Sequence, residues 1–344
     1  MLASLIVPTH NKAPFLARTL ASLARQDAPA FEVVVVDDGS DDDTREVARS
    51  VGGALDLRYL RRAHMGRAAA RNAGVRSARG DLLIFCDDDR LATPGFVREH
   101  IEAHTAAAAS SGAPLVALGR QRGVLTLWSR DWNVAAVTVA EVLARRPEVA
   151  GALAAPRAEL VSVEDVRERF ADTVAAHAVP EPWWERYLVP ILDEYGPEMT
   201  GFAFPWTAGV TGNLSTPRAL AEQVGLFDEA FVGWGLEDTD FHFRLHGAGA
   251  HTRILDGALS YHQIHARPPE QAAEWGRNAV RLLEKYDSLE ICLYLRVIRR
   301  RLALAEANRI AHEVAAGGSA VRSIVAELVR LNREHVRMLV QATP

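Results

Sequence analysis

The sequence predicts an α/β protein with a mainly parallel sheet and helices on both faces. In the first third of the chain, short apolar runs rich in β-branched residues alternate with longer segments that carry apolar residues at helical spacing. Polar clusters follow three of these runs, as expected where parallel strands end at one edge of a sheet. With 49% hydrophobic and 24% charged residues, the 344-residue chain has the composition of a folded globular protein.

Four strands are expected in this part, at 5–7, 31–36, 57–60 and 82–86, and all but the third are apolar runs closed by polar or turn residues. Three helices are expected between them, at 15–25, 43–50 and 67–78, and a further strand at 115–118. This alternation indicates βαβ units, whose right-handed crossovers place the carboxyl ends of the strands on one edge. The polar clusters at 9–11, 37–38 and 87–89 are therefore expected to meet in one crevice.

The remaining chain is expected to add a mostly helical insertion at 120–205 between two halves of the α/β domain, 1–119 and 206–267. The insertion is rich in tryptophan, contains an expected amphipathic helix at 164–177, and is a candidate lid or acceptor subsite. Simple core packing of the tryptophans is the alternative.

Residues 268–344 are expected to be helical, with a break at 317–318. An arginine-rich stretch at 296–301 predicts either a solvated helix face or a contact with a membrane surface or an acidic partner. The C-terminal helices as a whole are also a candidate surface for self-association.

Charge and cysteine content exclude several classes of protein. A formal net charge of −5 gives no broad attraction to nucleic acid or anionic lipid. No apolar stretch approaches the ~20 residues of a membrane span, and the first residues lack a basic signal-peptide region. Two cysteines are too few for a disulfide framework. We therefore expect no nucleic-acid partner, no membrane span and a cytoplasmic location.

Three consecutive aspartates follow the strand expected at 82–86. On an extended segment, Asp87 and Asp89 share a face and Asp88 does not. Two carboxylates on one face repel each other unless a cation lies between them, and Mg²⁺ or Mn²⁺ commonly bind carboxylates together with substrate phosphates. The pattern favours a metal-bound diphosphate over a solvated acidic turn.

Two other groups near the same edge suit a nucleotide. A carboxylate of Asp37 or Asp38 can accept a base N–H or a ribose hydroxyl, with an ordinary Asx turn as the alternative. Arg67 and Arg71 lie four residues apart on one helix face, where either can bind phosphate or brace an aspartate.

The later part of the chain carries a second acidic pair and two histidines. Glu237 and Asp238 open a helix expected at 239–246, where they either cap the helix or supply a general base. His262 and His265 follow a strand-like run, and either imidazole can bind a metal that already has aspartate ligands. A purely structural histidine is the alternative.

Four segments in this order resemble family 2 glycosyltransferases of the GT-A fold: VPTHN at 7–11, DDGS at 37–40, ARNAG at 70–74 and FCDDD at 85–89. Two others, GLFDE at 225–229 and GWGLEDTD at 233–240, resemble the acceptor-side segment of galactosyltransferases. The sequence departs from the family pattern at His10, where an aromatic residue is commoner, and in the insertion, which has no recognised counterpart.

The resemblance implies a nucleotide-sugar donor, usually a UDP-sugar, with Mn²⁺ or Mg²⁺ on its diphosphate. It places Thr9 and Asp37 at the base and Arg71 near the diphosphate, and it makes Asp87 and Asp89 a DxD motif. The donor-binding residues expected on this basis are Pro8, Thr9, Asn11, Asp37, Asp38, Arg67, Arg71, Asp87 and Asp88. The expected metal ligands are Asp87, Asp89, His262 and His265.

The resemblance also makes Asp238 the catalytic base and Glu237 its acceptor-binding neighbour. The other expected acceptor-binding residues are Trp206, Asn213 and Trp234. The predicted reaction is inverting transfer of a sugar to a hydroxyl or other nucleophile of a saccharide, peptide or small molecule. A retaining transferase, a sugar nucleotidyltransferase and a catalytically silent scaffold are the alternatives. The absence of glycine from residues 5–12 counts against the nucleotidyltransferase.

Overall fold

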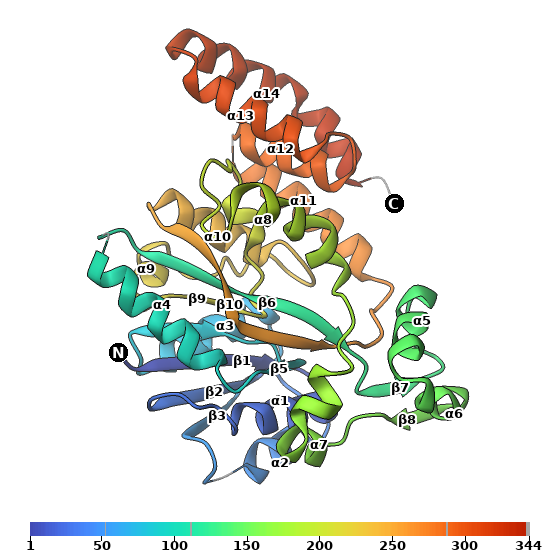
Figure 1. Ribbon diagram of the computed structural model, residues 1–344. Helices are drawn as coiled ribbons and strands as arrows, with labels where there is room; N and C mark the ends of the chain where they lie inside the picture. The colour runs from blue at the N-terminus through green and yellow to red at the C-terminus, as the bar shows by residue number, and fades with distance from the viewer. Residues whose placement is uncertain (52, 111, 287, 342–344) are drawn as a thin grey trace.

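The computed structural model describes residues 1–51, 53–110, 112–286 and 288–341 (Figure 1). Within them, eight strands form one sheet in the order β3-β2-β1-β4-β9-β6-β10-β5. Their bounds are β1 Ala3–Thr9, β2 Phe31–Asp37, β3 Leu57–Arg61, β4 Leu82–Phe85, β5 Arg90–Ala92, β6 Leu115–Val124, β9 Leu214–Pro217 and β10 His251–Gln263. β9 is antiparallel to β4 and β6, and β5 is antiparallel to β10, whereas the other pairs are parallel. The predicted mainly parallel α/β sheet is confirmed.

Helices cover both faces of this sheet (Figure 1). Leu5 and Val7 of β1 pack against α1 (Ala13–Leu23) and α4 (Phe96–Ser110). Ile6, pointing the other way, packs in the cluster that contains α3 (Arg67–Ser77) and α10 (Glu237–Gly247). Both faces are buried, which explains why these strands are continuous apolar runs rather than alternating ones. The short helix α2 (Thr44–Ser50) lies beside β2 and β3.

The segment between β6 and β9 is mostly helical. It contains α5 (Ala136–Arg145), α6 (Ala150–Ala154), α7 (Val163–Glu168), α8 (Val189–Tyr195) and a two-stranded sheet of β7 (Leu127–Ser129) and β8 (Arg157–Glu159). The expected boundary at 119/120 falls inside β6, which continues to Val124.

The single helix expected at 164–177 is wrong. α7 ends at Glu168, and a wide π-type turn, η2 (Ala171–Ala175), follows it. Val166, Phe170 and Val174 all pack in one small core. Their four-residue spacing is also that of one face of an α-helix, so the apolar pattern did not reveal the interruption of the helix at Arg169.

Four helices complete the chain: α11 (Gln271–Lys285), α12 (Leu289–Ile298), α13 (Leu304–Ala316) and α14 (Ser319–Gln341). α12, α13 and α14 stack at the end of the molecule remote from β3 (Figure 1). α11 packs against α14 and α12, and its Lys285 pairs with Asp240 of α10. The expected break at 317–318 is confirmed between α13 and α14. Among the described residues, no helix combines the length and the apolar character that a membrane crossing requires.

Candidate active site

The three aspartates after β4 point to two different places. Asp88 and Asp89 both lie near the ammonium group of Lys12, at 3.6 and 2.6 Å, whereas Asp87 pairs with an arginine of α3. The expectation that Asp87 and Asp89 share one face is therefore wrong. The chain forms a turn directly after β4 rather than an extended strand, so the two-residue alternation does not apply.

Lys12, which directly precedes α1, lies within a compact polar cluster. Its Nζ is 2.6 Å from Oδ2 of Asp89 and 3.0 Å from Nε2 of His265. Nε2 of His262 is 3.9 Å from the same carboxylate oxygen. The cluster joins three segments that are far apart in the sequence: the start of α1, the turn after β4 and the end of β10.

Both histidines present the same ring nitrogen to Asp89. Nδ1 of His262 lies 3.2 Å from Oε2 of Glu181, and Nδ1 of His265 lies 2.6 Å from the Ala266 carbonyl oxygen. These partners only accept hydrogen bonds, so we assign the proton of each neutral ring to Nδ1. Nε2 of each ring is then a lone-pair donor directed toward Asp89.

This arrangement fits a divalent metal ion. One ligand atom from each of Asp89, His262 and His265 lies within 4.8 Å of the others. Two imidazoles and one carboxylate suit Mn²⁺ better than Mg²⁺, which favours oxygen ligands alone. The sequence left His262 and His265 as alternatives, and the structure brings both to the site. Asp87 lies outside this group.

The charges of the cluster depend on one another. Burial raises the pKa of Asp88 to about 6. Burial also opposes the charge of Asp89, yet the nearby ammonium group of Lys12 holds the pKa of Asp89 well below its usual value. Burial and the nearby Arg90 guanidinium lower the pKa of His262, which keeps the ring neutral as metal binding requires.

Arg71 connects this edge of the sheet to the N-terminus of α10. Its Nη2 donates a hydrogen bond to Oδ1 of Asp87, and its Nη1 donates one to Oε1 of Glu237. Each donor–acceptor distance is 2.9 Å. Arg71 is 2% exposed, so the guanidinium joins the two carboxylates inside the protein. Arg67, one turn earlier, lies 3.9 Å from Glu237 with its side chain 40% exposed. The aspartate after β4 and the acidic pair of α10 therefore lie at one site.

The loop before α10 has an unusual backbone that α11 holds in place. Gly233, Gly235 and Leu236 have φ values of 80°, 95° and 71°, in the left-handed region. Nδ2 of Asn278 donates to the Gly235 carbonyl over 2.8 Å, and Glu274 accepts a backbone N–H of the loop over 2.9 Å. The C-terminal helices thus set the position at which α10 begins.

Glu237 and Asp238 differ in their surroundings. Glu237 is 2% exposed, and its Oε2 has no hydrogen-bond partner among the described residues. Asp238 is partly exposed, and its Oδ1 accepts the Thr239 N–H over 2.8 Å. Burial and the negative charge of Glu237 raise the pKa of Asp238 to about 7, which suits a general base near neutral pH.

The two aspartates expected to bind the nucleotide also order the loops around them. Oδ1 of Asp37 accepts the Ser40 N–H over 2.7 Å, and Oδ2 accepts the Tyr59 hydroxyl. Burial opposes the charge of Asp37, but these two hydrogen bonds help to lower its pKa below the usual value. Oδ2 of Asp38 accepts the Gly66 N–H over 2.7 Å, which fixes the turn before α3.

The other residues expected at the donor lie at the end of β1. Pro8 and Thr9 are buried in the strand, and Asn11 turns the chain with a φ of 52°. His10 and His64 stack with ring centroids 4.2 Å apart beside these loops. The sequence reasoning missed this pair because the two rings come from different loops.

Two of the residues expected to bind the acceptor lie in the core. Trp206 and Asn213 are both 0% exposed. Trp206 packs against Phe243 and Tyr294, and Nδ2 of Asn213 donates to the Ala258 carbonyl over 2.8 Å. Their expected contact with an acceptor is not compatible with this burial. The third, Trp234, is partly exposed in the loop before α10.

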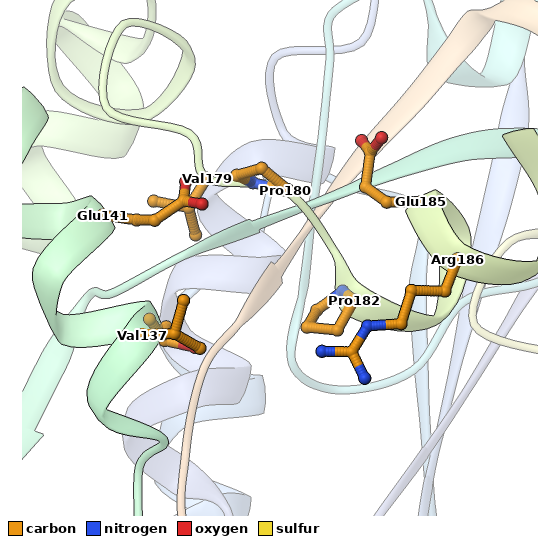
Figure 2. Close-up of a pocket in the computed structure, with 8 residues that line it drawn as sticks. Val137, Glu141, Val179, Pro180, Pro182, Glu185 and Arg186 are labelled. Atoms are coloured by element: carbon orange, nitrogen blue, oxygen red, sulfur yellow. The ribbon is translucent and has the colours of Figure 1, made fainter.

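A pocket of about 160 Å³ opens in the insertion (Figure 2). Its lining combines apolar, acidic and basic side chains: Val137, Thr138, Glu141, Val179, Pro180, Pro182, Glu185 and Arg186. Glu181 lies between the two lining prolines, and its carboxylate bonds to His262. One short segment therefore links the pocket to the metal-ligand cluster.

Lys12 and Glu181 are the main residues at this site that the sequence reasoning missed. Lys12 is one of only two lysines among 39 basic residues, and this rarity was the available signal. Glu181 gave no signal, because its partner lies 81 positions away in a different element.

Comparison with known proteins gives two family matches. Residues 4–126 match the family described as Glycosyl transferase family 2, and residues 197–266 match the N-terminal domain of galactosyltransferase. The uncharacterized glycosyltransferase YfnE of Bacillus subtilis is 31% identical over 84% of this chain and 71% of its own length. Validoxylamine A glucosyltransferase of Streptomyces hygroscopicus subsp. jinggangensis is 32% identical over 87% of this chain. The chain spans 64% of that protein's length.

Solved structures share the fold. S. aureus TarS 1–349 in complex with UDP-GlcNAc superposes with a TM-score of 0.55 at 19% identity, over 99% of this chain and 90% of that chain. The mannosyltransferase PcManGT of Pyrobaculum calidifontis, in complex with GDP-Man and Mn²⁺, has a TM-score of 0.50 at 17% identity. That match covers 98% of this chain and 83% of the other.

Proposed function

Since this chain belongs to the family 2 glycosyltransferases, we propose that it is a metal-dependent, inverting member that uses a UDP-sugar. Family membership makes it a glycosyltransferase rather than a sugar nucleotidyltransferase or a silent scaffold. The main support for the proposal is the Arg71 bridge, which holds Asp87 and Glu237 together and so brings Asp238 to the edge where β4 ends.

Asp238 is the proposed general base. Its carboxylate accepts the proton of an acceptor hydroxyl while the hydroxyl oxygen forms a bond to the anomeric carbon. The bond from that carbon to the diphosphate oxygen breaks, and UDP leaves with the electron pair. Glu237 is buried like Trp206 and Asn213, so its proposed role is to hold the start of α10 through Arg71 and thereby position Asp238.

Asp89, His262 and His265 are the proposed ligands for Mn²⁺. When bound, the ion neutralises the negative charge that develops on the leaving diphosphate. Glu181 and the Ala266 carbonyl orient the two imidazoles, and such partners strengthen metal binding through the ligands they hold.

Asp37 lies at the proposed position of the nucleobase. A carboxylate at this place can accept the imide N–H of uracil, and the ordered loops around Asp37 and Asp38 preform the surface. The solved TarS complex contains UDP-GlcNAc, and the PcManGT complex contains GDP-Man, so guanosine diphosphate donors are the natural comparison in a donor screen.

The pocket of the insertion is the proposed acceptor subsite. Its surface is mainly apolar, from side chains such as Val137, Val179 and Pro182, and it also carries the charged residues Glu141, Glu185 and Arg186, which suits a small acceptor with both apolar and polar parts. One relative is named for glucosylation of validoxylamine A, which places a small-molecule acceptor among the first compounds to test.

A nucleotide-sugar screen tests the proposal. We expect UDP-sugars with Mn²⁺ to raise the melting temperature, because a ligand that binds only the folded state stabilises it by mass action. With an acceptor, we expect release of UDP and a product whose anomeric configuration by NMR is opposite to that of the donor. A product that retains the anomeric configuration of the donor would exclude the inverting mechanism. Equal UDP affinity with and without a chelator would exclude the metal dependence.

A further inference from the structure

The ammonium group of Lys12 contacts the same ligand atoms that a metal ion would bind. Its Nζ lies 2.6 Å from Oδ2 of Asp89 and 3.0 Å from Nε2 of His265. These two ligand atoms are themselves 3.0 Å apart. That separation is close to the edge of an octahedron with bonds of about 2.1 Å, so the pair is already spaced for a divalent ion.

The hydrogen bond to His265 makes the conflict chemical as well as spatial. Nδ1 of His265 lies 2.6 Å from a carbonyl oxygen and therefore carries the proton of the neutral ring. Nε2 then has one lone pair in the ring plane, and the ammonium of Lys12 donates to it. A metal ion coordinates through the same lone pair, so the two contacts cannot exist together.

We propose that Lys12 is the resident cation of this site, and that its ammonium group and a divalent metal ion exclude each other from Asp89 and His265. The inference rests on the proposed metal-dependent function. It goes beyond that function because it makes Lys12 a residue that competes with the metal ion and so lowers the metal affinity. The lysine keeps the charge of the buried carboxylates compensated until the metal arrives.

The displaced ammonium has an alternative partner in the proposed reaction. Lys12 has a flexible four-carbon stem, and its side chain is 28% exposed. Lysine is a common phosphate ligand, so the donor diphosphate can take up the ammonium as the metal displaces it. Metal and nucleotide should therefore bind cooperatively. The diphosphate gives the displaced ammonium a new partner, which makes metal binding more favourable, and the metal frees the ammonium to bind the diphosphate.

Mn²⁺ binding to the full-length protein without nucleotide, followed by EPR, tests this exclusion. If Lys12 occupies the ligands in nine of ten molecules or more, the apparent metal affinity is reduced about tenfold or more. We expect Lys12→Met to tighten Mn²⁺ binding by at least that factor. The matched control is Lys285→Met, the other lysine of the chain, which pairs with Asp228 and Asp240. It should leave Mn²⁺ affinity unchanged.

Two further variants separate charge from packing. Lys12→Gln removes the charge with a polar side chain and should also tighten Mn²⁺ binding, which covers the case in which Lys12→Met fails to fold. Lys12→Arg keeps the charge and should not tighten it. UDP should strengthen Mn²⁺ binding more in the wild type than in Lys12→Gln.

The wild-type protein offers a readout that needs no loss of function. Only two lysines are present, so ¹³Cε-lysine labelling gives two side-chain signals, which Lys285→Met assigns. Titration with diamagnetic Zn²⁺ should shift the Lys12 signal and leave the Lys285 signal in place.

The outcomes distinguish this inference from the proposed function. If the wild type binds Mn²⁺ with UDP, but neither Lys12→Met nor Lys12→Gln binds it more tightly, the exclusion is wrong and the metal dependence stands. If no variant binds Mn²⁺ with or without UDP, both are wrong. An unchanged Lys12 signal during metal binding would also overturn the exclusion.

Discussion

Nη1 of Arg71 lies 2.9 Å from Oε1 of Glu237, and both residues are 2% exposed. One buried ion pair therefore fastens α3, which follows the nucleotide-side loops, to the first turn of α10. The same guanidinium holds Asp87 through its other nitrogen. The position of α10 relative to the end of β4 therefore depends on Arg71 as well as on the contacts from α11.

We expect Arg71→Met to destabilise the protein by about 3–5 kcal/mol, because it leaves two carboxylates near each other without their shared partner. Chemical unfolding measures the change. Arg67→Met is the control, since that side chain is 40% exposed and 3.9 Å from Glu237, and it should cost about 1 kcal/mol or less. Equal costs for the two variants would contradict the bridging role.

Asp238→Asn should retain UDP binding but reduce turnover by about 10²–10⁴-fold, the usual loss when a general base is removed. UDP affinity by calorimetry and initial rates with a saturating donor measure the two effects. Asp256→Asn changes an exposed carboxylate, 75% accessible, and should leave both unchanged. Turnover like that of the wild type would exclude Asp238 as the base.

The pH dependence of kcat/KM should follow Asp238. Its carboxylate must be ionised to accept a proton, and its pKa is raised to about 7, so the rate should increase as the pH rises through about 7. Glu237→Gln removes a negative neighbour and should move this acidic limb to lower pH, in addition to its effect on the rate. If the acidic limb does not move in Glu237→Gln, the group that titrates is not Asp238 under the influence of Glu237.

Glu181→Gln should weaken Mn²⁺ binding by about 10–100-fold, because His262 loses the carboxylate that orients its ring. Glu185→Gln is a control four residues further on, since Glu185 lines the pocket. Calorimetric titration with Mn²⁺ compares the two. An equal effect of both substitutions would indicate a general loss of charge rather than the contact with His262.

Two buried histidines of α4 should make stability depend on pH. Burial lowers the pKa of His100 to about 4 and that of His104 to about 3. The unfolded chain binds these protons near pH 6.5, so the free energy of unfolding should fall as the pH drops from about 6.5 toward 4. His100→Gln should reduce the slope by about 1.4 kcal/mol per pH unit in this range. Urea unfolding measures the free energy of unfolding at each pH. The same pH dependence in the wild type and in His100→Gln would contradict this prediction.

Strands β1, β2 and β4 of the parallel half of the sheet were predictable because they are buried on both faces. The run Val33–Val36 has no alternative to a central strand, and the polar residues after it mark where the strand ends. β5 and β9 were not predicted. They have three and four residues, too few for a period to be read, and their antiparallel pairing is set by tertiary contacts.

The site was predictable in its chemistry and less so in its pairings. Asp89, His262 and Glu237 were identified from residue type and position, and the structure brings each to the expected edge. The orientation of Asp87 was wrong because a turn replaces the extended segment. Burial of Trp206 and Asn213 was not visible in the sequence, because both lie in segments without a clear period.

The contact between α11 and the loop before α10 means that at least the first C-terminal helix helps to hold the proposed active site. A fragment that stops at residue 267 would keep every strand of the sheet and every proposed metal ligand, yet lose Glu274 and Asn278. Exchanging the C-terminal helices between relatives would therefore be expected to change the catalytic efficiency as well as any binding partner of these helices.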